Sequence, residues 1–296
     1  MGLRDVTLDE RIRGSIYGFM IGDAMGATNE FKHRVDIRGH EVNDIVGGGW
    51  LNLQPGQTTD DTAMMFCVAD AGMKYQRGSK SYFLDRCCKN FSEWAATNPP
   101  DIGKQCRYMI NYCSGYPYYY WQKVAKNEDA MGNGALMRAI GTVLAFPKYE
   151  NMTVEQGMLT HNAETQRTVL KAYHNVLVSL LLGKSYALRT KEIGVGKALM
   201  EPTGHVINTF NNALYFLNDS RYFSYGMLRA VNDGGDADTI AAITGSMLGA
   251  KFGFSNIPRR WVDQLNKADR IHAEIIIVKS YEIFKSAYLQ KHDYVL

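Results

Sequence analysis

An all-α fold is the most direct prediction from this chain of 296 residues. Apolar residues recur at the three- and four-residue spacing of helices, whereas the strict alternation of a half-buried strand is scarce. Only seven prolines interrupt the pattern, so long helices are expected. No linker, low-complexity tract or internal repeat divides the chain, and a single helical domain over residues 1–296 is the simplest organisation.

The predicted helices follow one another along most of the chain. The first covers residues 9–26 and places Ile12, Ile16, Phe19 and Met20 on one side. Later helices are expected at 60–76, 81–96, 103–113, 134–146, 153–158, 164–182, 190–200, 206–217, 223–231 and 259–289. Loops are indicated where Gly, Pro and Asn cluster, at Gly47-Gly48-Gly49, Pro55-Gly56, Asn98-Pro99-Pro100 and Asn232-Asp233-Gly234-Gly235.

Stripes of small residues mark two helices as special. Residues four apart share one face of a helix, and the first helix carries Gly14, Gly18, Gly22 and Gly26 at that spacing. A second stripe follows residue 236 and consists of Ala242, Gly245, Gly249 and Gly253. Glycine costs roughly 1 kcal/mol inside a helix, so this many glycines need a packing reason. We predict that the two helices are central and closely packed.

The composition is that of a globular protein and argues against several functions. Hydrophobic residues make up 46% and charged residues 21% of the chain, which is inconsistent with a disordered protein. The net charge is only +3 and Lys and Arg are scattered, so no nucleic-acid or anionic-membrane surface is indicated. The longest strongly apolar stretch, residues 176–182, is far too short to cross a bilayer.

The N-terminus and the cysteines predict a cytoplasmic protein. Residues 1–5 contain no apolar segment of the kind found in signal peptides. The five cysteines are odd in number, and none belongs to a Cys-x-x-Cys or Cys/His zinc pattern. They are therefore expected to be reduced thiols.

Two acidic motifs at predicted helix starts suggest a metal site. The first is Thr58-Thr59-Asp60-Asp61-Thr62, in which Thr59 is the expected N-cap. The second is Asp236-Ala237-Asp238-Thr239, directly after a glycine pair that allows the backbone to fold back. Each motif alone is explained by capping and by compensation of the helix dipole. If the two segments meet, four carboxylates would repel one another unless hard divalent cations bind them.

Five further segments are candidates for function. Asp23 and Glu30 lie within and after the first glycine stripe, and Asp23 could equally be a buried structural acceptor. Gly132-Asn133-Gly134 at a helix start exposes backbone N–H groups that could cradle a phosphate, although a Gly-x-Gly pattern alone is weak evidence. Thr160-His161-Asn162 offers a histidine that could instead be structural, and Asp101-Ile102-Gly103 indicates another helix start. The aromatic run 116–121 could stack a base, although packing is the simpler explanation.

Together these motifs resemble the ADP-ribosylglycohydrolase family. The matching segments, which span most of the chain in the family's order, are Gly22-Asp23-Ala24 with Glu30, Thr59-Asp60-Asp61-Thr62, Gly132-Asn133-Gly134 with Met137-Arg138, Thr160-His161 and Gly234-Gly235-Asp236-Ala237-Asp238-Thr239. Within the family the chain is similar to bacterial dinitrogenase-reductase-activating glycohydrolases. That similarity rests on Gly47-Gly48-Gly49-Trp50-Leu51, Pro55-Gly56-Gln57, Asp101-Ile102-Gly103 and Ile257-Pro258-Arg259-Arg260-Trp261.

The resemblance implies a helical hydrolase with two Mg²⁺ or Mn²⁺ ions. The implied metal ligands are Thr59, Asp60, Asp61, Asp236, Asp238 and Thr239, with Glu30 as a supporting or catalytic acid beside them. The implied reaction is hydrolysis of the N-glycosidic bond between ribose C1 and the guanidine nitrogen of an ADP-ribosylated arginine. The implied partners are an ADP-ribosylated protein, such as dinitrogenase reductase, and a regulator of nitrogen signalling.

Roles can be assigned to individual residues on this basis. Asp60 is the best candidate for a metal-bound carboxylate that also handles a proton, and Asp101 is the next. The expected substrate-binding residues are Gly132, Asn133, Gly134, His161, Asn162 and His205. His205 stands where the subgroup tends to carry a tyrosine that lines the cleft, and Ala163-Glu164 replaces a His-Pro pair.

Three alternatives remain open at this level. The same chemistry could act on another linkage, such as serine, O-acetyl-ADP-ribose or a nucleobase. The chain could instead be a non-catalytic ADP-ribose-binding or structural relative of the enzymes. A different binuclear metallohydrolase is disfavoured, because the seven histidines form no paired motif.

Overall fold

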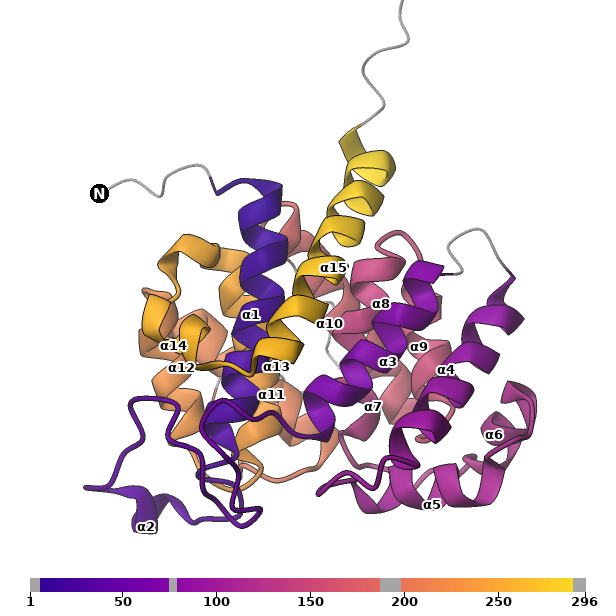
Figure 1. Cartoon of the computed structure of the whole chain (residues 1–296), viewed down its shortest axis with the longest axis horizontal. Coiled ribbons are helices and arrows are strands. Elements are labelled where there is room, and N and C mark those ends of the chain that lie inside the picture. Colours follow the sequence, from indigo (N-terminus) through magenta and orange to yellow (C-terminus); the bar gives the residue numbers. More distant parts are fainter. Residues whose placement is uncertain (1–5, 75–78, 187–197, 290–296) are drawn as a thin grey trace, which may run out of the picture.

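The computed structural model describes residues 6–74, 79–186 and 198–289, and this part of the chain is helical, as predicted (Figure 1). Within it the only β-type pairing consists of isolated bridges, at Gly48–Leu53, Lys126–Asn162 and Gly132–His205. The first helices are α1 (Leu8–Gly26), α2 (Arg34–Ile37), α3 (Asp60–Lys74), α4 (Lys80–Ala95), α5 (Lys104–Cys113), α6 (Tyr118–Val124), α7 (Gly134–Met137) and α8 (Ala139–Ala145). They are followed by α9 (Glu150–Gly157), α10 (Glu164–Leu181), α11 (Val206–Asp219), α12 (Phe223–Val231), α13 (Ala237–Phe252), α14 (Arg259–Gln264) and α15 (Lys267–Phe284), with short turns at Phe254–Asn256 and Lys285–Leu289.

Helices α1 and α13 form the centre of the fold and lie against each other along their length (Figure 1). A Cβ atom at Gly14 would come within 2.5 Å of the Gly249 backbone oxygen, and one at Gly18 would come even closer to Gly245. The predicted close packing of the two glycine helices is therefore confirmed. The side chains on the remaining faces of α1 pack against the other helices around it. Every residue from Gly14 to Gly26 is therefore buried.

The register of the second stripe differs from the prediction. The residues of α13 that face the α1 glycines are Ala237, Ala241, Gly245 and Gly249, which are spaced four apart. Ala242 is one position out of this row. Gly253 lies beyond the helix end, where its φ of 85° allows the chain to turn away. The correct register places the start of α13 beside the end of α1, which is where the acidic residues lie.

Two apolar clusters surround this pair. The larger one joins α1 and α13 to α8, α10, α11, α12 and α15, and it includes the fully buried Phe19, Tyr173, Phe210 and Trp261. The smaller cluster lies between α3, α4, α5 and α6 around Trp121. No helix in the described residues is both long enough and apolar enough to cross a membrane.

Several predicted helices have different boundaries. The span 134–146 is broken at Arg138, whose guanidinium bonds the Gly134 carbonyl and so takes the place of a backbone donor. The span 259–289 is broken by Asn266, whose side chain accepts from the Ala268 N–H and caps a new helix. Helix α6 was not predicted, because its tyrosines show no periodicity and only the buried Trp121 anchors it. Of the helix expected at 190–200, residues 190–197 lie outside the described residues, and 198–200 are not helical.

The close packing of α1 and α13 predicts an unusual response to alanine. In an ordinary helix, Gly→Ala gains about 1 kcal/mol of stability. For Gly18→Ala we expect a loss of about 1–3 kcal/mol instead, because the new methyl group meets the Gly245 backbone. Guanidinium denaturation of the full chain measures this difference, and a stabilised variant would contradict the close approach.

Candidate functional site

A cleft of about 860 Å³ opens where the starts of α3, α5, α7 and α13 meet the turn that follows α1. Helix starts carry free N–H groups and the positive end of the helix dipole, so this meeting point favours anionic groups. Most of the predicted site residues line the cleft, namely Glu30, Asp60, Asp61, Asp101, Gly132, Asn133, Gly134, His161, Asp236, Asp238 and Thr239. The two acidic motifs therefore meet in space.

The carboxylates at the base of the cleft form a compact group. One oxygen of each of Glu30, Asp236 and Asp238 lies within 4.8 Å of the others. Thr239 donates a hydrogen bond of 3.3 Å to Asp61, which connects the α13 start to the α3 start. Sequence segments about 180 residues apart are thus joined at one point.

Burial and mutual repulsion raise the pKa values of these acids. Burial is the largest cause for Glu30, followed by the charges of Asp236, Asp101 and Asp60, and its pKa is raised to about 8. Burial, with the charge of Asp101 next, raises the pKa of Asp60 to about 8. The pKa values of Asp61, Asp236 and Asp238 are also raised, mainly by burial. Without a cation the cluster favours bound protons.

Two carboxylate oxygens in this group fit a cation. Asp61 Oδ1 and Asp238 Oδ1 are buried and have no hydrogen-bond partner among the described residues. A buried, unpartnered carboxylate oxygen is costly unless a cation binds it. The donors are carboxylate and hydroxyl oxygens, which suit hard divalent ions such as Mg²⁺ and Mn²⁺. The acidic cluster can therefore hold metal.

Asp23 positions the start of α3 and does not line the cleft. Its carboxylate accepts the N–H groups of Thr59 and Thr62 at 3.0–3.1 Å, and the Thr62 hydroxyl at 2.6 Å. It thus caps the N-terminus of α3 from α1, which matches the structural interpretation of this residue. Thr59 in turn accepts the Asp61 N–H at 3.3 Å, as expected of an N-cap.

The start of α13 is held by backbone conformation and by Asn133. Gly234 and Gly235 have φ values of 78° and 60°, which a residue with a side chain rarely adopts. The Asn133 amide donates to Asp236 and, at 2.9 Å, to the Thr209 hydroxyl. The side chain of Asn133 therefore orients a carboxylate of the acidic cluster.

Asp60 and Asp101 face each other across the cleft floor. The charge of the nearby Asp101 adds to burial in raising the pKa of Asp60. The Gly103 N–H, at the start of α5, donates to Asp60 at 2.9 Å. Two neighbouring carboxyls with raised pKa values are suited to acid–base chemistry.

An aromatic rim, formed by Phe31 and Trp50, was not predicted. Trp50 donates its indole N–H to Glu30 at 2.5 Å, and its ring centroid lies 5.4 Å from that of Phe31. Both side chains line the cleft and are more than half exposed. Phe31 adopts a φ of 61°, which is strained for a phenylalanine. Its N–H donates to the Gly235 carbonyl at 2.6 Å, and the Gly235 N–H donates back to the carbonyl of Lys32. The only sequence signal for this rim is the glycine loop that precedes Trp50.

The Gly132–Gly134 turn lies over the ring of His161. A Cβ atom at Gly132 would come 3.1 Å from His161 Nε2, and one at Gly134 would come 3.0 Å from its Cε1. The glycines therefore make room for the imidazole. The N–H of Asn133 donates to the Gly204 carbonyl at 2.9 Å, so this group of the predicted cradle is already engaged.

Three predicted site residues do not line the cleft. Thr59 lies directly behind it as the N-cap of α3. The Asn162 side chain bonds the Gln122 carbonyl and Arg167, and so faces α6 and α10. His205 caps α11 through a 3.3 Å bond from the Ile207 N–H. The structure does not bring the side chains of Asn162 and His205 to the cleft.

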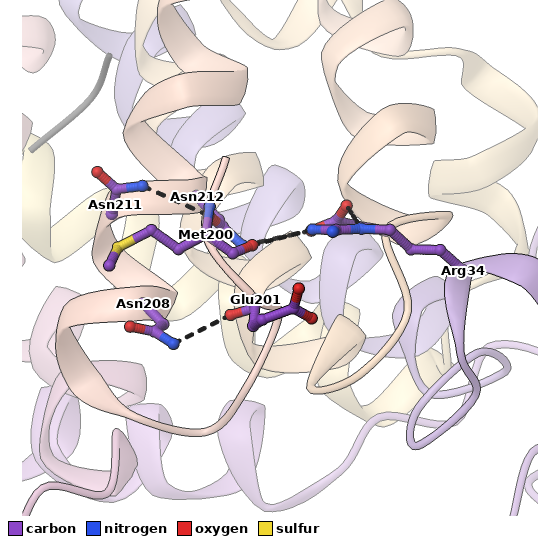
Figure 2. A network of polar contacts seen from close by, with 7 residues as sticks. Arg34, Met200, Glu201, Asn208, Asn211 and Asn212 are labelled. Atoms are coloured by element: carbon purple, nitrogen blue, oxygen red, sulfur yellow. Dashed lines mark hydrogen bonds and ion pairs between the residues drawn. The ribbon is translucent and has the colours of Figure 1, made fainter. Parts of the chain in front are cut away.

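The segment before His205 is held by a polar network (Figure 2). The Arg34 guanidinium donates to the Met200 carbonyl at 2.9 Å and pairs with Asp233 at 2.7 Å. Asn212 of α11 accepts the Met200 N–H at 2.8 Å, and Asn208 bonds the Glu201 carbonyl. These bonds connect the segment that contains Gly204 to the loop that precedes α13 and its acids.

The cysteines and the aromatic run play no part in this chemistry. All five cysteines are free. Cys106 lines the cleft, but burial raises the pKa of its thiol, so it is not an activated nucleophile. In the aromatic run Trp121 is fully buried and Tyr116 stacks on Tyr120 with centroids 4.5 Å apart. Its members are absent from the cleft lining, which supports the packing interpretation.

The fold is that of a known class. The family model described as ADP-ribosylglycohydrolase matches residues 4–291. The chain belongs to the ADP-ribosylglycohydrolase family.

Several relatives are similar over most of their length. The ADP-ribosyl-[dinitrogen reductase] glycohydrolase of Rhodospirillum rubrum is 28% identical over 283 residues, which cover 88% of this chain and 92% of the relative. The ADP-ribosylarginine hydrolase Tri1 of Serratia proteamaculans is 29% identical, covering 88% of this chain and 77% of the relative. A solved structure titled ADP-ribosylglycohydrolase-related protein complex matches with a TM-score of 0.77 and 28% identity, covering 93% of this chain and 98% of that chain.

The raised pKa values predict how pH affects the metal-free protein. Glu30 and Asp60 bind protons in the fold up to about pH 8 but lose them near pH 4 when unfolded. Their contribution to stability is therefore complete below about pH 4 and is lost as the pH rises through 8. We expect the Tm of chelator-treated protein to fall as the pH rises from about 5 to about 8 and to level off above pH 8.

Metal should cancel most of this fall, because it binds the deprotonated carboxylates. Scanning calorimetry with Mg²⁺ and with chelator measures both curves. The cysteine thiols titrate in the same way with Mg²⁺ and with chelator. The difference between the two Tm curves therefore reports on the acidic cluster alone. An equal Tm with and without metal at every pH would contradict the metal site.

Proposed function

We propose that this protein is a two-metal hydrolase that removes ADP-ribose from ADP-ribosylated arginine on a protein. The observation that carries the proposal is the acidic cluster, in which Asp61 and Asp238 each present an unpartnered buried oxygen at the base of a cleft. The names of the relatives support the choice of arginine, since two of them are a dinitrogen-reductase glycohydrolase and an ADP-ribosylarginine hydrolase.

The metals would be Mg²⁺ or Mn²⁺, held in the proposed binuclear site. The proposed ligands are Thr59, Asp60, Asp61, Asp236, Asp238 and Thr239. When bound, such ions orient the ribose hydroxyls and polarise attached oxygens. Thr59, behind the cleft, would contribute through its oxygen or by holding Asp61.

The acids of the cleft would carry out the proton transfers. Hydrolysis breaks the bond from ribose C1 to the guanidine nitrogen, adds a water oxygen to C1 and returns a proton to the departing guanidine. Asp60 and Asp101 would share a proton, with one carboxyl donating while the other accepts, as their neighbouring positions and raised pKa values suggest. Glu30 and the neighbouring carboxylates would stabilise positive charge that develops at C1.

The aromatic rim suits an arginine leaving group. Guanidinium ions stack on aromatic faces, with a stabilisation of about 0.5–2 kcal/mol. Trp50 and Phe31 present such faces beside Glu30, at the exposed edge of the cleft. A neighbouring cavity of about 710 Å³, which shares Phe31 and Gly204 with the cleft, would accommodate the polypeptide around the arginine.

The rest of the ligand would extend toward Gly132 and His161. Gly132, Gly134 and His161 line the cleft and would contact the diphosphate and ribose, whereas Asn133 would act through Asp236. For Asn162 and His205 a direct contact would require their side chains to reorient, because both are engaged elsewhere. By similarity, the proposal also includes a physiological target such as dinitrogenase reductase. It further includes a regulator of nitrogen signalling and a cytoplasmic location.

Release of free ADP-ribose from an arginine-ADP-ribosylated protein tests the proposed reaction. We expect release with Mn²⁺ or Mg²⁺ and none with chelator, since the carboxylates cannot organise the ribose without cations. A serine-linked peptide is the matched substrate, and arginine should be preferred. Activity that is unaffected by chelator would contradict the two-metal mechanism, and preference for serine would move the proposal to that linkage.

Asp60→Asn tests the proton-handling acid. The substitution removes both a proposed ligand and the proton shared with Asp101, so kcat should fall at least about 100-fold. Asp70→Asn is the matched control on the same helix, because Asp70 lies outside the cleft and pairs with His272 at 3.0 Å. Calorimetry checks that both variants fold, and a normal kcat for Asp60→Asn would exclude the assignment.

A further inference from the structure

Arg138 is a buried cation that the proposed chemistry does not use. Its side chain is fully buried, and no carboxylate among the described residues pairs with it. The guanidinium instead donates to the Gly134 carbonyl at 2.8 Å, to Gln156 at 2.8 Å and to the Thr160 hydroxyl at 2.8 Å. It also lies 4.9 Å from the centre of the Phe91 ring. Burial of an arginine without a counter-charge is costly, and so calls for a function.

The bonds of Arg138 determine the direction of the next hydrogen bond. The guanidinium can only donate, so Thr160 Oγ1 accepts from it. The same oxygen lies 2.8 Å from His161 Nδ1. The Cys106 sulfur also lies within reach of the Thr160 hydroxyl, but an imidazole nitrogen is a much better acceptor than sulfur. This arrangement favours donation of the Thr160 hydroxyl proton to His161 Nδ1.

This relay fixes the protonation of the imidazole. Burial and the charge of Arg138 lower the pKa of His161 to about 3, so the ring is neutral near pH 7. Since Nδ1 accepts from Thr160, the single ring proton sits on Nε2. His161 lines the cleft, with Nε2 beneath the Gly132–Gly134 turn. The cleft is thus presented with an N–H donor in front of a buried positive charge.

We propose that Arg138 is a positioning residue which, through Thr160, holds His161 as the Nε2–H tautomer that donates to a diphosphate oxygen of the ligand. The proposal rests on the proposed function, because it takes the ligand to be ADP-ribose. Arg138 also holds the Gly134 carbonyl away from the cleft, so that this face of the turn does not repel an anion.

The direct substitution of Arg138 risks unfolding the protein, since its bonds join α7 to α9. Thr160→Val tests the relay more cleanly, because valine keeps the shape but cannot pass the proton to His161. We expect the affinity for ADP-ribose, measured by calorimetry with Mg²⁺, to fall about tenfold. Thr160→Ser restores the hydroxyl and should restore most of the affinity.

The chain provides a matched control. Thr153 and His174 form a second buried pair with the same 2.8 Å bond from hydroxyl to Nδ1, outside the cleft lining. Thr153→Val should therefore cost comparable stability but change the affinity for ADP-ribose less than about twofold. Equal losses of affinity in Thr160→Val and Thr153→Val would overturn the proposal.

Nitrogen NMR of the histidine side chains tests the relay separately from the reaction. In the wild-type chain we expect His161, assigned with a His161→Gln variant, to carry its proton on Nε2, and Thr160→Val to lose this preference. A proton on Nδ1 would overturn the relay even if ADP-ribose binds. A wild-type chain with the expected tautomer that fails to bind ADP-ribose would instead refute the proposed function and the diphosphate contact, while leaving the relay intact.

Discussion

The backbone contact between α1 and α13 is the constraint on which the rest of the structure depends. With no side chain between Gly18 and Gly245, the two helices approach far more closely than ordinary helices, which stay 8–10 Å apart. The end of α1 is thereby brought against the start of α13, and Glu30 meets Asp236 and Asp238. A side chain at Gly18 or Gly245 would meet the facing backbone, so the close approach that brings these acids together depends on both glycines.

Beside this seam lies a cluster of buried carboxyl groups whose charged form is unfavourable without a cation. Burial raises the pKa of every acid in the cluster, and Asp61 and Asp238 retain oxygens with no partner among the described residues. The helix starts offset part of this cost through their dipoles. A cation bound at this cluster, as the proposed function requires, would offset the remainder.

The cleft is lined by two chemically different groups. Trp50 and Phe31 form an exposed aromatic edge beside Glu30, while Arg138 places a positive charge behind His161. A ligand with a cationic leaving group and an anionic diphosphate complements this polarity. Thr160 and Thr153 illustrate how context gives meaning to a contact, since the same Thr–His bond faces a cleft in one case and solid packing in the other.

The sequence by itself determined the helical fold, the glycine seam and the acidic residues at the helix starts, because each depends on spacing of a few residues along one helix. The family resemblance also predicted Glu30, Asp60, Asp101 and His161 as site residues, and all four line the cleft. Only the tertiary structure decided the rest. Contacts between distant segments set the register of α13 against α1 and form the rim of Phe31 and Trp50. Such contacts also turn the side chains of Asn162 and His205 away from the cleft. Arg138 interrupts the helix predicted at 134–146. Its partner Thr160 lies on another element, so the local sequence pattern does not reveal their contact.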